Sequence, residues 1–180
     1  MKYILLAFLL FTVFACSDDD DGSTTTGNTQ EYFKYTIDGV ERIFDFDVEI
    51  HLETDTSTSA NRFEFNASGQ QPSGALRRVS GNLYFDSNGV FLPVQPYNWG
   101  FLYNNETETK FFFSESTSSN IFVLTPSFTD HPIVATITGI APNNVGDYLE
   151  FTFSGTFSQN GTTKTISGEC RAQREADQNF

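Results

Sequence analysis

The sequence has few basic residues. Its 180 residues include 10 Lys and Arg against 23 Asp and Glu, which gives a formal net charge of −13 at pH 7. An acidic surface repels a phosphate backbone, so we exclude nucleic acid as a partner. The sequence also lacks an apolar run of about 20 residues, the length that a transmembrane helix needs. Its longest apolar stretch, 3–14, is interrupted by Thr12 and is too short to cross a membrane permanently.

Motifs that carry hydrolytic or metal chemistry are also missing. His131 follows Asp130, but adjacent side chains seldom face one another, and no serine lies in a nucleophile-elbow motif. The acidic run 18–21 begins like a calcium loop, yet Thr29 occupies the position where that loop requires glutamate. We therefore predict a protein that is not an enzyme and that uses no cofactor or metal ion.

Residues 1–15 have the form of a signal peptide, with a positive start and an apolar core. Val13, Ala15 and Cys16 resemble the lipobox of bacterial lipoproteins, in which a small residue precedes the cysteine that carries lipid. The resemblance implies that Cys16 carries the lipid, and that its acyl chains hold the protein on a membrane. The alternative is an ordinary secretory signal with a cysteine in its cleavage zone.

Four aspartates follow this cysteine: Asp18, Asp19, Asp20 and Asp21. The run resembles the export signal of Bacteroidota lipoproteins, which implies a lipid-anchored protein on the outer face of the outer membrane. The alternative is a hydrated tether without signal value, because like charges keep a chain extended. Residues 16–30 as a whole are polar and unpatterned, which predicts a flexible linker.

The rest of the chain, 31–174, alternates apolar and polar residues with the period of β-strands and shows no helical periodicity. This pattern predicts a single all-β domain, an antiparallel β-sandwich or jelly roll of about nine strands. The 20 Phe and 7 Tyr residues would fill its core. Residues 175–180 are predicted to form a polar, frayed tail.

Two hairpins can be predicted in register. Both Asp-Gly at 38–39 and Asn-Gly at 160–161 favour two-residue turns. The second turn places Phe153 opposite Gly168, so that a large side chain meets a small one. These two hairpins resemble the ends of small uncharacterised lipoproteins of flavobacteria and related Bacteroidota. That resemblance implies a β-sandwich in the cell envelope and implies no catalytic residue.

The second cysteine, Cys170, is predicted to be buried. The hairpin register places it opposite Phe151 on the core face, and it has no disulfide partner if Cys16 carries lipid. The alternative is a reactive nucleophile.

One predicted strand, 40–53, has an acidic face. We expect its core face to hold Phe44, Phe46, Val48, Ile50 and Leu52, and its outer face to hold Asp45, Asp47, Glu49, His51 and Glu53. The carboxylates of Asp45, Asp47 and Glu49 could hold a cation or act as a general acid and base. A solvated strand face is the alternative.

The segment 90–103 is the binding candidate that the sequence favours. Its prolines, Pro93 and Pro96, predict an edge strand or an irregular loop. Exposed aromatic rings beside an amide suit a glycan or peptide ligand. The candidate ligand-binding residues are Tyr97, Asn98, Trp99, Phe101 and Tyr103. The alternative is that Trp99 closes one end of the core.

These features predict a surface-displayed outer-membrane lipoprotein that acts as a non-catalytic binding or adhesion module for a glycan or peptide. The alternative is a structural envelope protein that binds another protein. An enzyme that uses the surface carboxylates is a third possibility.

Overall fold

The computed structural model describes residues 30–54, 61–70, 73–85, 95–100, 108–117 and 131–179. All regular secondary structure in these ranges is β-strand, and no helix in them could span a membrane. The predicted signal peptide, 1–15, and the predicted lipidation and export residues, Cys16 and Asp18 to Asp21, lie outside them. The strands are β1 (Tyr32–Ile37), β2 (Val40–Phe44), β3 (Phe46–Thr54), β4 (Asn61–Gln70), β5 (Leu76–Phe85), β6 (Tyr97–Trp99), β7 (Lys110–Thr117), β8 (Ile133–Ile137), β9 (Tyr148–Gln159), β10 (Thr162–Gln173) and β11 (Gln178–Asn179).

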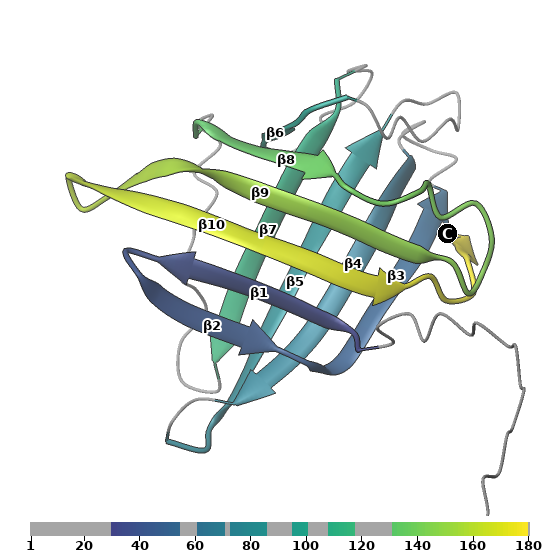
Figure 1. Cartoon of the computed structure of the whole chain (residues 1–180), viewed down its shortest axis with the longest axis horizontal. Coiled ribbons are helices and arrows are strands. Elements are labelled where there is room, and N and C mark those ends of the chain that lie inside the picture. Colours follow the sequence, from purple (N-terminus) through teal and green to yellow (C-terminus); the bar gives the residue numbers. More distant parts are fainter. Residues whose placement is uncertain are drawn as a thin grey trace, which may run out of the picture.

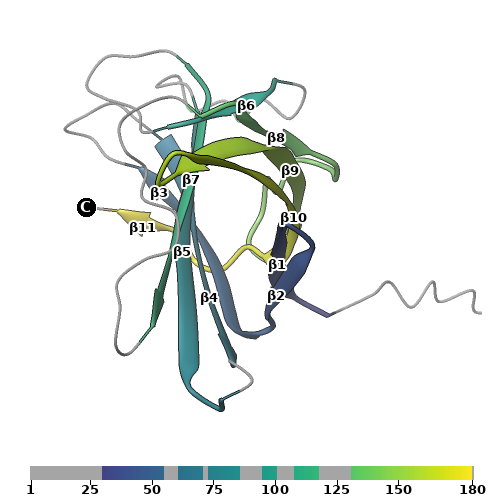
Figure 2. The ribbon, with the colours of Figure 1, turned by 90° about the vertical axis from the view of Figure 1, so that its left-hand side faces the viewer.

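Hydrogen bonds join these strands into one sheet, in the order β11-β3-β4-β5-β7-β6-β8-β9-β10-β1-β2. The sheet curls over itself into a nearly closed barrel: β8, β9, β10, β1 and β2 cross over β3, β4, β5 and β7 (Figure 1). Figure 2 shows the two layers facing one another, with β6 at one end. The all-β prediction is confirmed. Two separate sheets of a sandwich or jelly roll are not confirmed, because the ladder is continuous.

The sheet is mixed, whereas the sequence predicts antiparallel pairing throughout. β6 runs parallel to β7, and β11 runs parallel to β3. Neither parallel pair is joined by a two-residue hairpin turn, because residues 100–109 separate β6 from β7 and seven other described strands lie between β3 and β11 in the chain. No hairpin turn therefore sets the direction of these pairs.

The two predicted hairpins are confirmed. Both central residues of each turn, 38–39 and 160–161, have positive φ, as a two-residue turn of this type requires. In the second hairpin Phe153 faces Gly168, as predicted. A Cβ atom on Gly168 would lie 2.4 Å from Cζ of Phe153, so the glycine provides the space that the ring occupies.

The core lies between the two layers and is largely aromatic. Phe33 of β1 is fully buried at its centre. Its ring centroid lies within 6.5 Å of those of Tyr35, Phe44, Phe65, Phe113, Phe151 and Phe153. Cys170 is buried opposite Phe151, and burial raises the pKa of its thiol. A buried thiol of raised pKa is a poor nucleophile, which supports the structural interpretation.

The strand predicted over 40–53 is two strands, because the chain passes from one layer to the other at Asp45. Just after this corner, Asp47 and Val48 together oppose a single residue of β4, Ala67, and Asp47 has a φ of 47°. This is a β-bulge. The extra residue shifts the alternation by one position, so Phe46 is 60% exposed and does not enter the core as predicted.

The C-terminal residues 175–179, part of the segment predicted to be a polar tail, lie against β3. The amide of Glu175 donates to the carbonyl of Ile50 at 2.8 Å, and β11 then pairs with the end of β3. The buried Arg174 donates to the carbonyl of Pro142 at 2.7 Å and to the carboxylate of Asp177. These contacts give the polar segment partners that its sequence does not reveal.

Candidate functional site

The aromatic residues of β6 do not form a ligand surface. Tyr97 is fully buried and Trp99 is 1% exposed, whereas Asn98 between them is exposed. The prediction that Tyr97 and Trp99 bind a ligand is therefore corrected, because strand alternation turns both rings inward. Phe101 and Tyr103 lie outside the described residues.

Trp99 packs against the aromatic run of β7. Its ring centroid lies 5.5–5.9 Å from those of Phe111, Phe112 and Phe113, in edge-to-face geometry. β6 is not an edge strand, since it pairs with β7 on one side and with β8 on the other. The short strand thus joins the two layers, and its tryptophan fills the core at that junction, as the alternative interpretation proposed.

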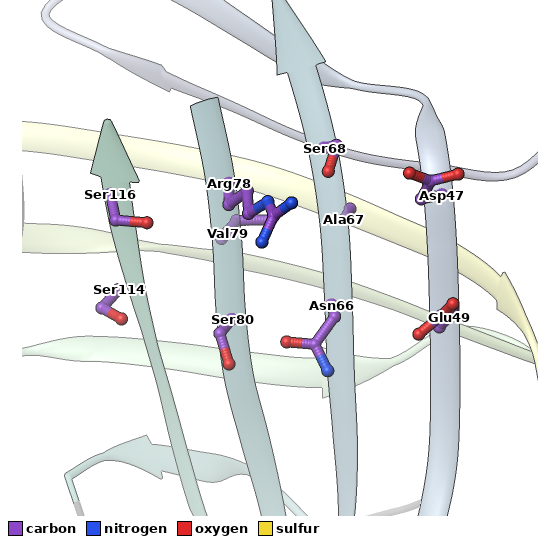
Figure 3. A pocket seen from close by; sticks show the side chains of 10 residues that line it. All are labelled: Asp47, Glu49, Asn66, Ala67, Ser68, Arg78, Val79, Ser80, Ser114 and Ser116. Atoms are coloured by element: carbon purple, nitrogen blue, oxygen red, sulfur yellow. The ribbon is translucent and has the colours of Figure 1, made fainter. Parts of the chain in front are cut away.

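A polar trough lies over β3, β4, β5 and β7, on the face turned away from the opposite layer (Figure 3). Its volume is about 420 Å³, which is within the range of small-molecule sites. Parts of the core residues Ala67 and Val79 form its floor. Its polar lining consists of Asp47, Glu49, Asn66, Ser68, Arg78, Ser80, Ser114 and Ser116.

The strand register arranges these polar side chains in two rows. Directly paired residues of neighbouring strands project from the same face of a sheet. One row, from β3 to β7, is Glu49, Asn66, Ser80 and Ser114. The second row is Ser68, Arg78 and Ser116, and the bulge places Asp47 at its β3 end (Figure 3).

The charged side chains of the trough are available to a ligand. Neither Arg78 nor Asp47 forms an ion pair or a side-chain hydrogen bond with another described residue. Glu49 lies 3.8 Å from Nε2 of His51, and Nδ2 of Asn66 donates to Glu64 at 3.3 Å. The trough therefore offers a guanidinium donor, carboxylate acceptors and serine hydroxyls that can donate or accept.

The acidic face predicted for 40–53 is not a single site. Asp47 and Glu49 line the trough, but Asp45 lines a separate hollow with Phe46 and Leu76. The corner and bulge between β2 and β3 separate the carboxylates that a regular strand would have aligned. Within the described ranges, no three His, Cys, Asp or Glu side chains are grouped closely enough to hold a metal ion.

A buried polar cluster links the two layers beneath the trough. Glu115 of β7 is 1% exposed and accepts a hydrogen bond from the hydroxyl of Tyr35. Nη1 of Arg42 donates to the same carboxylate at 2.8 Å, and Nε of Arg77 lies 3.5 Å from its other oxygen. Burial, together with the negative charge of Glu115, raises the pKa of Tyr35. Tyr35 and Arg42 come from β1 and β2, so the cluster joins one layer to the other.

The adjacent arginines of β5 face opposite sides of the sheet, because side chains alternate along a strand. Arg77 points inward to Glu115, and Arg78 lies in the trough. The sequence analysis gave Arg78 no role and did not identify the trough. The available signal was a polar residue at every second position of 64–68, 78–80 and 114–116. Aligning these segments requires knowing that their strands are neighbours.

No protein-family model matches this chain, and no curated protein or solved structure matches it either. The fold and site therefore define its class: an all-β protein whose curled mixed sheet carries a polar trough on its outer face.

Proposed function

We propose that this protein is a non-catalytic binding module, and that the trough holds a polar, hydroxyl-rich ligand, a glycan. The observation that carries the proposal is that one serine-lined trough holds both the guanidinium of Arg78 and the carboxylate of Asp47, and that neither group is bound to another described side chain. Sugar hydroxyls both donate and accept hydrogen bonds, and the lining offers both kinds of partner to them.

The strand order favours a glycan over an extended peptide in this trough. Peptides that add to a sheet use the unpaired backbone of an edge strand. β4 and β5, which form the middle of the trough, are hydrogen-bonded to a strand on each side. Recognition must therefore come from side chains, and eight of the ten residues that line this site have polar side chains.

Blocking the trough tests the proposal. Ser80 is exposed at its middle, between Asn66 and Ser114 in the same row, and Ser80→Leu would place an apolar side chain there. We expect the variant to lose at least tenfold in affinity for any glycan that the natural chain binds on an array of neutral and charged glycans. Its stability should change by no more than about 0.5 kcal/mol, because the position faces solvent.

Ser154→Leu is the matched control, since Ser154 is an exposed serine in a central strand of the opposite layer. It should bind as the natural chain does. Equal binding by both variants would place the ligand outside the trough and refute the proposed site.

We further propose that the module is anchored by lipid at Cys16 and displayed on the outer membrane surface, with Asp18, Asp19, Asp20 and Asp21 as its export signal. The support is the sequence pattern of the first 21 residues. A chain of 15 residues, from 16 to 30, reaches at most about 50 Å, which would let the trough face ligands beyond the lipid surface.

The anchor predicts a clear difference between the two cysteines. Cys16→Ser should abolish the incorporation of labelled palmitate in growing cells and release the protein from the membrane fraction. Cys170→Ala should leave both unchanged, because that thiol is buried in the core. Membrane retention of the Cys16→Ser protein would refute the lipid anchor.

A second candidate function is binding of another envelope protein, and an apolar surface favours it. Phe46 is 60% exposed and shares a hollow with Leu76, which is 50% exposed. Ile43 and Val40, also exposed, lie on β2, which ends the sheet. If a protein docks there, the double variant Phe46→Ser, Leu76→Ser should lose a crosslinked neighbour that the natural chain captures in intact cells. An unchanged crosslinking pattern would exclude this surface.

A further inference from the structure

The charges in the trough are separated along it. Arg78 lies on β5, whereas Asp47 and Glu49 lie on β3, and β4 places the uncharged Asn66 and Ser68 between them. Two strand spacings correspond to about 10 Å. Figure 3 shows the guanidinium of Arg78 extended toward Ser68, on the side of the acidic residues. It nevertheless forms no ion pair with them, so the positive and the negative charges of the trough are separated, with the negative charges on its β3 side.

This arrangement discriminates between ligands by their charge. A simple anion would be attracted by the guanidinium but repelled by the two carboxylates. A simple cation would be attracted by the carboxylates but repelled by the guanidinium. A neutral sugar would use hydrogen bonds alone. A ligand with both charges can form a charge-assisted hydrogen bond at each end, and such bonds are about twice as strong as neutral ones.

We propose that the trough selects a sugar that carries both a carboxylate and an amino group. The ligand carboxylate lies at Arg78, whose register partners in the same row are Ser68 and Ser116. The hydroxyl of Ser68, toward which the guanidinium extends, can donate to the carboxylate oxygens. The ammonium group lies between Asp47 and Glu49. This inference rests on the proposed glycan-binding function and names the ligand class of the same site.

The row that contains Asn66, Ser80 and Ser114 can bind the uncharged part of the ligand. Asn66, Ser80 and Ser114 follow one another across three strands beside Arg78. Their amide and hydroxyl groups can bind the hydroxyls of the sugar ring, whichever groups carry the charges. A volume of about 420 Å³ accommodates a charged monosaccharide unit together with part of a neighbouring unit.

Four sugars built on one pyranose ring test the inference: glucose is neutral, glucuronate is an anion, glucosamine is a cation, and muramate carries both charges. Each is titrated into the soluble Cys16→Ser chain, with its signal segment removed, and followed by NMR chemical shifts. We expect muramate to bind about tenfold tighter than glucuronate or glucosamine, and tighter still than glucose. Its advantage should fall as salt is added, because the contacts lie at the surface.

Variants assign each end of the ligand. Arg78→Ala should reduce muramate to the affinity of glucosamine, and Asp47→Asn with Glu49→Gln should reduce it to that of glucuronate. Arg78→Lys should restore part of the affinity that Arg78→Ala loses, since an ammonium keeps the charge but lacks the planar two-pronged donor. Lys164→Ala and Glu41→Gln, on the opposite layer, are the matched controls and should leave the order of the four sugars unchanged.

The outcomes separate this inference from the function on which it rests. Equal affinities for the four sugars, with equal losses in the trough variants, would overturn the charge selection and leave the glycan site intact. If none of the four sugars binds, and Ser80→Leu does not change the binding of any glycan on the array, both the inference and the proposed function are overturned. A rank order in which a singly charged sugar binds best would likewise overturn the inference.

Discussion

Phe33→Ala is expected to lower the free energy of unfolding by about 3–5 kcal/mol. The ring is fully buried between the two layers and contacts aromatic residues of both, among them Phe65 and Phe153, each stacked on it. Removing it leaves a cavity that the rigid β-layers can close only in part. The loss would be measured by chemical denaturation of the soluble chain, followed by the fluorescence of Trp99, its single tryptophan.

The control for this prediction is another phenylalanine. Phe46→Ala removes the same side chain at a position that is 60% exposed, so its effect should stay within about 0.5 kcal/mol. If both substitutions cost the same, the aromatic cluster around Phe33 would not be the centre of the core.

Glu115→Ala is the second prediction of large effect, with an expected loss of about 3–5 kcal/mol. The substitution removes the carboxylate that accepts hydrogen bonds from Tyr35 and Arg42 and forms an ion pair with Arg77. The cost arises because the arginines are left in a partly desolvated place without a counter-charge, and because the contact between layers is lost. Denaturant unfolding would measure it, with Glu41→Gln on the exposed face of β2 as the control.

A double-mutant cycle identifies the cause. Arg42→Met should recover part of the stability that Glu115→Ala loses, because it removes one uncompensated charge and keeps most of the side-chain volume. A second substitution that simply adds to the loss would show that Glu115 acts through packing and not through this charge pair.

Local patterns in the sequence were sufficient for the two hairpins. Asp-Gly and Asn-Gly turns fix the register of the strands that they join, and the pairing of Phe153 with Gly168 excludes a slipped register. Because these interactions involve residues close in the chain, propensity and alternation predict them without knowledge of the rest of the fold.

The prediction from apolar and polar alternation is wrong where a β-bulge inserts one extra residue into β3. The bulge at Asp47 turns Phe46 outward and separates Asp45 from Glu49, and nothing in the run of apolar and acidic residues marks that position. Alternation also leaves open whether a face meets a core or solvent. It could not distinguish a buried Trp99 from an exposed one, since the answer depends on the position of β6 between β7 and β8.

Local sequence patterns predict that the described part of the chain is all-β, that two-residue turns lie at 38–39 and 160–161, and that aromatic side chains form the core. They do not predict that the strands join in one curled sheet, that Glu115 lies buried between layers, or that Arg78 and Asp47 share a trough. Turns and side-chain alternation arise between residues close in the chain, whereas the trough exists because four strands, distributed over 46–117, lie beside one another in the fold.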